Sequence, residues 1–137
     1  MGNRFVKGYK CTICGKIFKE NEASLTCPDC GEKGILDVVF DYEELKKVLN
    51  LDYFKKNTDY SMWRYAPLMG VSDEHIKEML RIGWTPLIKS NNLAKLLGLK
   101  ELYIKDDGLN PSGSSKDRAS GVAVLKAIEA GAKVISC

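Results

Sequence analysis

The sequence lacks the features that would mark a membrane or secreted protein. It has no run of about 18 apolar residues, so no segment is long enough to span a bilayer as a helix. The first ten residues, MGNRFVKGYK, are charged and contain no apolar stretch, which excludes a secretory signal. We therefore expect a cytoplasmic protein with no membrane partner.

A strong excess of charge of either sign is also missing. The formal net charge is +3, and residues 1–40 hold six Lys or Arg against five Asp or Glu. A nucleic-acid module normally concentrates basic residues on one face, so we expect no nucleic-acid partner. With 45% hydrophobic and 28% charged residues, the composition is that of a globular chain.

Four of the five cysteines form two Cys-x2-Cys pairs separated by twelve residues. In a cytoplasmic chain this pattern favours metal ligation over disulfides. A glycine follows each pair and permits the turn that directs backbone amides at the sulfurs. The predicted ligands of one structural zinc ion are Cys11, Cys14, Cys27 and Cys30.

Two alternatives for these cysteines stay open. The ribbon could have lost its metal and keep four reduced thiols. Either pair could also serve in redox chemistry, although neither opens a helix directly after a strand, as redox pairs of the thioredoxin type do.

Three zones follow one another along the chain. Residues 1–40 form the predicted zinc ribbon, which ends in a β-branched strand at 35–40. Residues 41–82 form a predicted helical connecting segment. It starts with a helix over Asp41–Phe54, continues through the apolar stretch SMWRYAPLM, and has a second helix that follows Ser72 and ends at Gly83.

Residues 83–137 form the third zone, where helices and strands alternate. The pattern predicts helices over 90–99 and 116–130 and strands over 101–105 and 132–136. A strand, a helix and a strand in this order make one βαβ unit of a parallel sheet. Parallel strands need neighbours and helices on both faces, so we expect an α/β domain that is incomplete in this chain and a natural protein that continues.

The segment NPSGSSKDR, Asn110 to Arg118, places one lysine at the start of a helix, behind a loop of small residues. Such residues often do no more than cap a helix, and a lysine there is usually solvated. The chemical alternative is that the small side chains let a planar group approach the backbone. Because the helix dipole disfavours an ammonium at Lys116, the amine is suited to a Schiff base with pyridoxal phosphate.

Several motifs support the chemical alternative by resemblance. NPSGSSKDR resembles the N-P-[ST]-G-S-x-K-x-R signature of the fold-type II pyridoxal-phosphate enzymes, and GWTPL at 83–87 resembles their G-x-T-P-L motif. The segment around WRY at 63–65 and the N-terminal ribbon resemble those of threonine synthases. The chain departs from the family at Ser115, where phenylalanine is usual, and at Ala119, where glycine is frequent.

The resemblance implies a fold and a set of functional residues. The expected fold is a small four-cysteine zinc ribbon followed by the start of a three-layer α/β domain. Lys116 is the residue expected to bind pyridoxal 5'-phosphate and to act in catalysis. Thr85 and Ser114 are the expected substrate contacts.

The activity implied by the resemblance is that of a lyase of threonine biosynthesis. It would convert O-phospho-L-homoserine and water into L-threonine and phosphate, with a small amino acid as substrate and a possible homodimer as the assembly. Because the family's substrate-carboxylate loop and its site for the cofactor phosphate would both come after residue 137, and the phosphate site is needed to hold the cofactor, we expect this chain alone to be inactive. The alternatives are a cysteate synthase, a threonine dehydratase-like enzyme, or a zinc-ribbon binding module.

Overall fold

The structure is a computed structural model that describes residues 2–23 and 25–136. The chain forms two compact units, each assembled from two separate stretches. The first unit comprises Met1–Asn57 and Tyr65–Glu74, and the second comprises Thr58–Arg64 and His75–Cys137. Among the described helices, none is long and apolar enough to cross a membrane.

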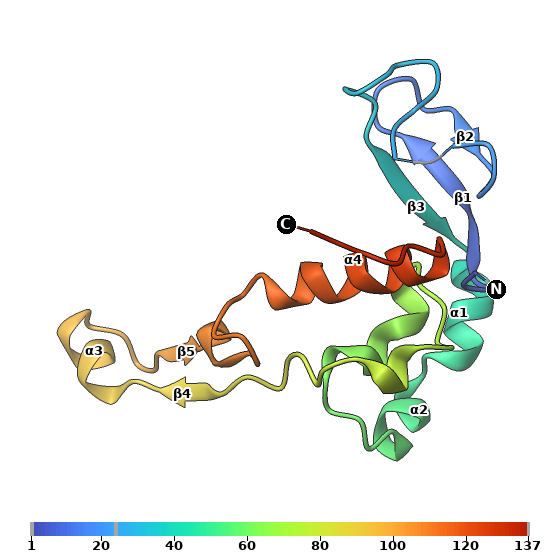
Figure 1. The fold of residues 1–137 in the computed structure, drawn as a ribbon. Helices are drawn as coiled ribbons and strands as arrows, with labels where there is room; N and C mark the ends of the chain where they lie inside the picture. Colours follow the sequence, from blue (N-terminus) through green and yellow to red (C-terminus); the bar gives the residue numbers. More distant parts are fainter. Residues whose placement is uncertain (1, 24, 137) are drawn as a thin grey trace. The chain divides into compact units, whose positions relative to one another are not determined.

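The first unit is built on a three-stranded antiparallel sheet in the order β2-β1-β3 (Figure 1). The strands are β1 (Val6–Cys11), β2 (Ile17–Phe18) and β3 (Leu36–Phe40). In the register, Tyr9 on β1 is opposite Phe18 on β2 and Val38 on β3. The strand predicted at 35–40 is therefore confirmed as β3.

Two short helices follow the sheet where the sequence predicted one helix over Asp41–Phe54. They are α1 (Tyr42–Val48), capped by Asp41, and α2 (Leu51–Lys56), capped by Asn50. The prediction was wrong because Asn50 adopts an extended backbone and its side chain accepts a hydrogen bond from the amide of Tyr53. An asparagine that caps the next helix thereby ends the first one.

The apolar stretch after α2 forms a 3₁₀ helix, η1 (Met62–Leu68), whose first residues are buried in the second unit. Trp63 is 5% exposed and its indole Nε1 donates to the Leu80 carbonyl at 2.8 Å. The amide of Met62 donates to the Ile82 carbonyl at 2.7 Å. The backbone at 80–82 is thus engaged by η1 rather than by a helix of its own.

A second wrong prediction is the helix after Ser72. The structure forms only a 3₁₀ turn there, η2 (Ile76–Glu78). Ser72 does accept from the amide of Glu74, as a cap would, at 3.2 Å. The Glu78 amide donates to the His75 carbonyl and the Met79 amide donates to the Ile76 carbonyl, which is the i to i−3 pattern of a 3₁₀ turn rather than the i to i−4 pattern of an α-helix.

In the second unit, β4 (Leu87–Lys89) and β5 (Tyr103–Lys105) pair as an antiparallel hairpin, and the helix α3 (Asn91–Leu96) lies at its tip (Figure 1). The helix and the strand predicted for 90–105 are confirmed. The parallel βαβ unit is not formed by the described residues. β5 pairs with β4 along one edge, and no described strand pairs with its other edge.

The longest described helix, α4 (Asp117–Glu129), confirms the helix predicted at 116–130. Its inward face carries Gly121 and, one turn later, Leu125, which is 1% exposed. A Cβ at Gly121 would come within 2.7 Å of the Ile82 side chain and 3.2 Å of the Trp63 ring. This close approach packs α4 against Trp63 and Ile82.

Residues 132–136 do not form the predicted strand. A β-strand is stable only where its amides and carbonyls find partners. No described strand pairs with these residues, so the β-branched residues of AKVIS have no neighbouring strand with which to form a sheet.

We expect Leu125→Ala to lower the free energy of unfolding of the second unit by about 2–5 kcal/mol, because it removes a fully buried side chain and leaves a cavity. The matched control is Leu96→Ala on α3, where the leucine is 80% exposed. Urea unfolding of the 137-residue chain followed by tryptophan fluorescence measures both. Equal losses for the two variants would contradict the assigned core.

Candidate functional site

The first candidate site is the cluster of four cysteines in the first unit. Cys11 ends β1, and Cys14 follows in the turn that returns the chain to β2. The glycines after each pair have positive φ, 73° at Gly15 and 63° at Gly31, and each donates its amide to the carbonyl of the first cysteine of its pair. Both pairs are therefore held in the same tight turn, as the sequence predicted.

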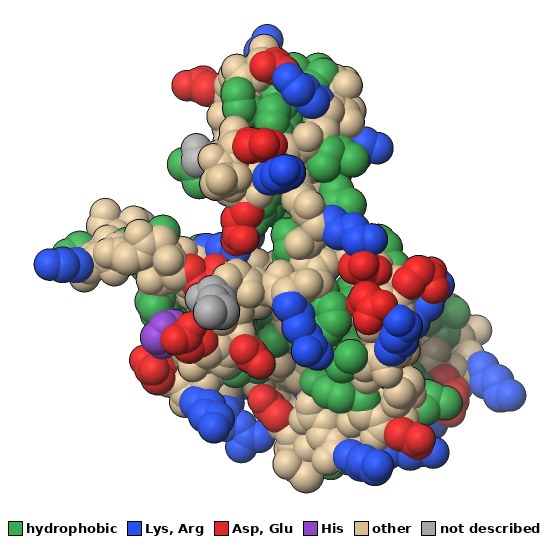
Figure 2. Space-filling view, turned by 90° about the vertical axis from the view of Figure 1, so that its right-hand side faces the viewer, with side chains coloured by type: hydrophobic (Ala, Val, Ile, Leu, Met, Phe, Trp, Pro, Cys, Tyr) green, Lys and Arg blue, Asp and Glu red, His purple; other side chains and the backbone are tan. Residues whose placement is uncertain are grey.

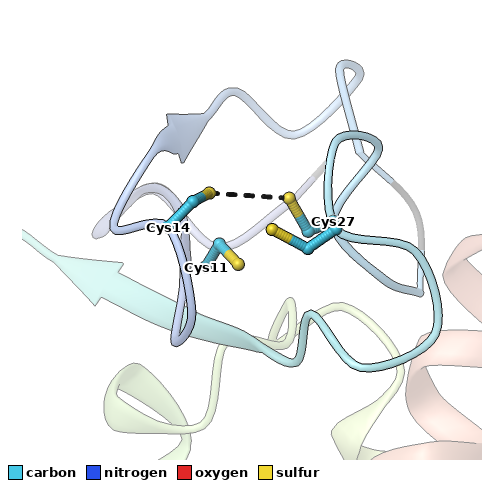
Figure 3. A group of neighbouring side chains, drawn as sticks. Cys11, Cys14 and Cys27 are labelled. Atoms are coloured by element: carbon cyan, nitrogen blue, oxygen red, sulfur yellow. Dashed lines mark hydrogen bonds between the residues drawn. The ribbon is translucent and has the colours of Figure 1, made fainter.

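The four sulfurs lie close enough together to be candidate ligands of one ion. All lie within 4.8 Å of one another, and Figure 3 shows the labelled cysteines facing a common centre. The Cys14 and Cys27 sulfurs are 3.9 Å apart. Tetrahedral zinc with metal–sulfur bonds of about 2.3 Å needs a sulfur separation of about 3.8 Å. The donor set therefore fits a metal ion with a closed thiolate shell.

The pKa shifts of the cysteine thiols show why a cation would stabilise this cluster. A backbone hydrogen bond from Cys14 lowers the pKa of the Cys11 thiol to about 7. The hydrogen bond with the Cys14 side chain raises the pKa of Cys30 to about 12, and burial raises the pKa of Cys27. Hydrogen bonds thus favour the thiolate of Cys11, and burial or side-chain hydrogen bonds disfavour those of Cys27 and Cys30, whereas a divalent ion would stabilise all four thiolates.

The second candidate site is the lysine loop, Asn110–Lys116, in the second unit. Lys116 is the N-cap residue of α4 and is exposed, and its amide donates to the Ser114 hydroxyl at 3.2 Å. The Asp117 carboxylate accepts from both the amide and the hydroxyl of Ser112. The loop is therefore closed on itself by the first residue of α4.

A third segment, residues 83–86, is tied to the lysine loop by Asp107. The Asp107 carboxylate accepts two hydrogen bonds from Arg118, at 2.6 and 3.0 Å, and one from the Thr85 hydroxyl at 3.0 Å. Asn110 adds a second link, since its side chain accepts from the Gly83 amide and donates to the Asp107 carbonyl. Thr85 and the base of the lysine loop therefore belong to one hydrogen-bonded frame.

These contacts extend the sequence-based predictions. Asp117 and Arg118 order the start of α4 through their hydrogen bonds with Ser112 and Asp107. Ser114 and Thr85 lie in the frame, and their substrate roles remain predictions. Sequence reasoning missed Asp107, although an acidic residue nine positions before a lysine at a helix start would have been a candidate partner for Arg118.

Sequence reasoning also missed Trp84. Its φ of 54° places a non-glycine residue in the left-handed region, which costs free energy and is concentrated at functional sites. The Trp84 ring lies against Tyr60 with ring centroids 4.3 Å apart. Trp84 directly precedes Thr85 in the sequence. It is 68% exposed, so its ring presents an aromatic surface to solvent.

Figure 2 shows that acidic and basic side chains are interspersed over the face in view. Elsewhere in the described residues, several charges are paired across short distances, for example Lys16 with Asp29 and Lys89 with Glu101. The face in view therefore carries no single large patch of one charge sign.

We expect the purified 137-residue chain to contain one zinc ion, and Cys27→Ser to reduce the zinc content to near zero, because a buried ligand is lost. Cys137→Ser is the matched control, since the fifth cysteine lies outside both pairs. Metal analysis of unchelated protein measures the content. A wild-type value near zero would contradict the metal site.

The hydrogen bonds from Arg118 lower the pKa of Asp107 from 3.8 to about 2. A lowered pKa in the folded protein adds stability that is fully present above pH 3.8 and is lost as the pH falls through about 2. We therefore expect the stability difference between wild type and Asp107→Asn to shrink over this interval. Tryptophan fluorescence measures it in the second unit, which holds both Trp63 and Trp84.

Asp106→Asn provides the control for this acid titration. It removes the neighbouring carboxylate but keeps the side-chain oxygen that accepts from the Gly108 amide. We expect a smaller difference from wild type at every pH. A difference for Asp107→Asn that stayed constant from about pH 5 to pH 2 would refute the assigned ion pair.

Comparison with known proteins adds independent findings. A family model described as pyridoxal-phosphate dependent enzyme matches residues 69–137. The chain is 42% identical to the threonine synthase of Methanocaldococcus jannaschii over 128 residues, which are 93% of this chain and 31% of that protein. It is 40% identical to the threonine synthase of Methanosarcina acetivorans over 129 residues, 93% of this chain and 30% of that protein.

A shorter match, 46% identical over 74 residues, is to the threonine synthase of Synechocystis, with 53% of this chain and 19% of that protein covered. No solved structure matches the chain at a significant level. The chain spans about a third of the length of the first two relatives.

These matches confirm the resemblance that the motifs indicated. The family model includes the whole lysine loop and the GWTPL motif, and it covers half of the chain. The chain therefore belongs to the family of pyridoxal-phosphate dependent enzymes.

Proposed function

We propose that the protein containing this chain converts O-phospho-L-homoserine and water into L-threonine and phosphate. The observation that supports this most is the similarity to two threonine synthases across 93% of the chain. The reaction breaks the carbon–oxygen bond to phosphate, so the enzyme would be a lyase acting on a phosphate ester.

The lysine loop suits pyridoxal phosphate in its chemistry. The side chains at 112–115 are no larger than serine, and a Cβ at Gly113, whose φ is 75°, would have the Gly108 carbonyl oxygen, 4.0 Å away, as its nearest neighbour. A planar ring can therefore approach the backbone beside Lys116. When bound, pyridoxal phosphate supplies an electron sink for carbanions next to the amino group of the substrate.

Within this proposal, Lys116 is the catalytic residue. Its amine holds the cofactor and then, once released, moves protons at the substrate carbons. An exposed side chain on a fixed backbone suits both tasks, because the amine can reach different atoms while its Cα stays in place. The hydrogen bonds of Ser114 and Asp117 around the loop supply that fixed backbone.

Thr85 and Ser114 are the proposed substrate contacts. The Thr85 hydroxyl donates to Asp107, which leaves its oxygen lone pairs available to a donor on the substrate. The Ser114 hydroxyl accepts from the Lys116 amide, which leaves its proton available to a substrate carboxylate or phosphate. The two hydroxyls thus offer complementary hydrogen bonds.

We assign the cysteine cluster a structural role, with zinc as its ion. A closed four-thiolate shell has no open position for water or substrate. In the same proposal, residues 1–40 form the ribbon domain, 41–82 the connecting segment and 83–137 the start of the catalytic domain.

The test uses the full-length protein with pyridoxal phosphate and O-phospho-L-homoserine. We expect a visible absorbance band from the bound cofactor and release of phosphate with formation of threonine. Lys116→Ala should remove the band and lower kcat by at least about 100-fold, because both attachment and proton transfer are lost. Lys100→Ala, which removes another exposed lysine, should change neither quantity.

The products separate this proposal from its alternatives. Cysteate formed from phosphoserine and sulfite, without threonine from phosphohomoserine, would point to a cysteate synthase. Release of ammonia from threonine would point to a dehydratase. A wild-type protein that binds pyridoxal phosphate at no lysine would refute the assignment of Lys116 and favour a binding module.

A further inference from the structure

We propose that Asp107 is a positioning residue for the reaction, one that sets the location of the Lys116 amine relative to Thr85. The inference rests on the proposed function, because it presupposes that Lys116 acts on the cofactor and substrate. It concerns a residue that lies outside the lysine signature and that has no chemistry of its own to perform.

The contacts of Asp107 join segments that are distant in sequence. Asp107 opens the 3₁₀ turn η3 (Asp107–Leu109), and its carboxylate binds Arg118 in the first turn of α4 and Thr85 in the segment 83–86. One side chain therefore accepts three hydrogen bonds from two residues that lie on either side of it in the sequence. The bidentate geometry with Arg118 fixes orientation as well as distance.

Asn110 strengthens the same junction from the other side of η3. It is 5% exposed, accepts from the Gly83 amide at 2.9 Å, and donates to the Asp107 carbonyl at 2.7 Å. The segment 83–86 is thus held at Gly83 by Asn110 and at Thr85 by Asp107. Lys105 adds a hydrogen bond from its amine to the Thr85 carbonyl.

The position of Lys116 follows from these links. Lys116 lies two residues before Arg118, and the amide of Ser120 donates to its carbonyl at 2.9 Å. Its backbone is therefore part of the first turn of α4, and the Arg118 side chain anchors that turn to Asp107. Loss of the Asp107 carboxylate would release Arg118 and Thr85 together and leave the lysine itself unchanged.

A merely stabilising ion pair is the competing explanation. The side chains of Arg118 and Asp107 are 38% and 30% exposed, so solvent screening limits the stability that the pair adds. Displacement of reacting groups by about 1 Å, in contrast, can lower a rate about 100-fold. The exposure of the pair therefore favours a positioning role over a stabilising one.

The experiment compares Asp107→Asn and Asp107→Glu with wild type in the full-length protein. In Asp107→Asn the amide places an NH2 group against an Arg118 N–H or the Thr85 hydroxyl, so at least one hydrogen bond and the charge are lost. We expect kcat per loaded lysine to fall about 10- to 100-fold, with KM within about threefold of wild type. Asp107→Glu, which keeps the carboxylate, should recover part of the lost kcat.

Loading is measured separately from turnover. Borohydride reduction followed by peptide mass spectrometry counts the pyridoxyl groups fixed on Lys116, and kcat is divided by that count. Asp106→Asn is the matched control, because Asp106 contacts neither Arg118 nor Thr85 in the described hydrogen bonds, and its kcat per loaded lysine should equal that of wild type.

The outcomes separate this inference from the proposed function. A wild-type protein without a pyridoxyl group on Lys116 would refute the proposed function. A loaded, active wild type with unchanged kcat per loaded lysine in Asp107→Asn would overturn the positioning role alone. If Asp107→Asn does not fold, Arg118→Lys, which keeps the charge but loses the bidentate geometry, should show the same fall, and an unchanged kcat would be decisive against the role.

Discussion

The ion pair between Asp107 and Arg118 is the interaction on which the geometry of the second unit depends. The Asp107 carboxylate also accepts a hydrogen bond from the Thr85 hydroxyl, so a single side chain determines how three segments meet. A lysine loop made of small residues has few side-chain contacts with which to hold itself in place. The frame around Asp107 and Asn110 supplies that order from outside the loop, while the lysine side chain stays exposed.

The first unit achieves order by a different route. Its sheet has three short strands, and two of the most deeply buried residues there are Cys11 and Cys27, which pack with Phe18. The centre of this small module is therefore its candidate metal site as well as its core. A module that buries so little apolar surface gains most from a bound ion, because metal binding and folding are then one equilibrium.

Both sites follow one structural rule: a reactive or ligating side chain projects from a short turn whose backbone is fixed by other residues. In the turns of the two cysteine pairs, the amides of Gly15 and Gly31 fix the backbone. In the lysine loop, the carboxylates of Asp117 and Asp107 do so. The membership of the pyridoxal-phosphate family gives the second turn its proposed chemistry. The first turn needs no chemistry beyond ligation.

Local patterns in the sequence determined the features that depend on neighbouring residues. The spacing of the cysteine pairs, the strand at 36–40, the helix α4 and the lysine at its start could all be predicted, because turn chemistry and hydrophobic periodicity act over a few positions. The motifs also identified the family, because they preserve short stretches around the functional groups.

Only the tertiary structure decided where distant segments meet. The segment after Ser72 forms only the short turn η2, the Leu80 and Ile82 carbonyls accept hydrogen bonds from η1, and β5 pairs with β4 in an antiparallel hairpin. Asp107 could not be recognised as the centre of the frame from its own sequence context. Its role depends on hydrogen bonds to residues 22 positions before it and 11 after it, and no local propensity encodes such a meeting.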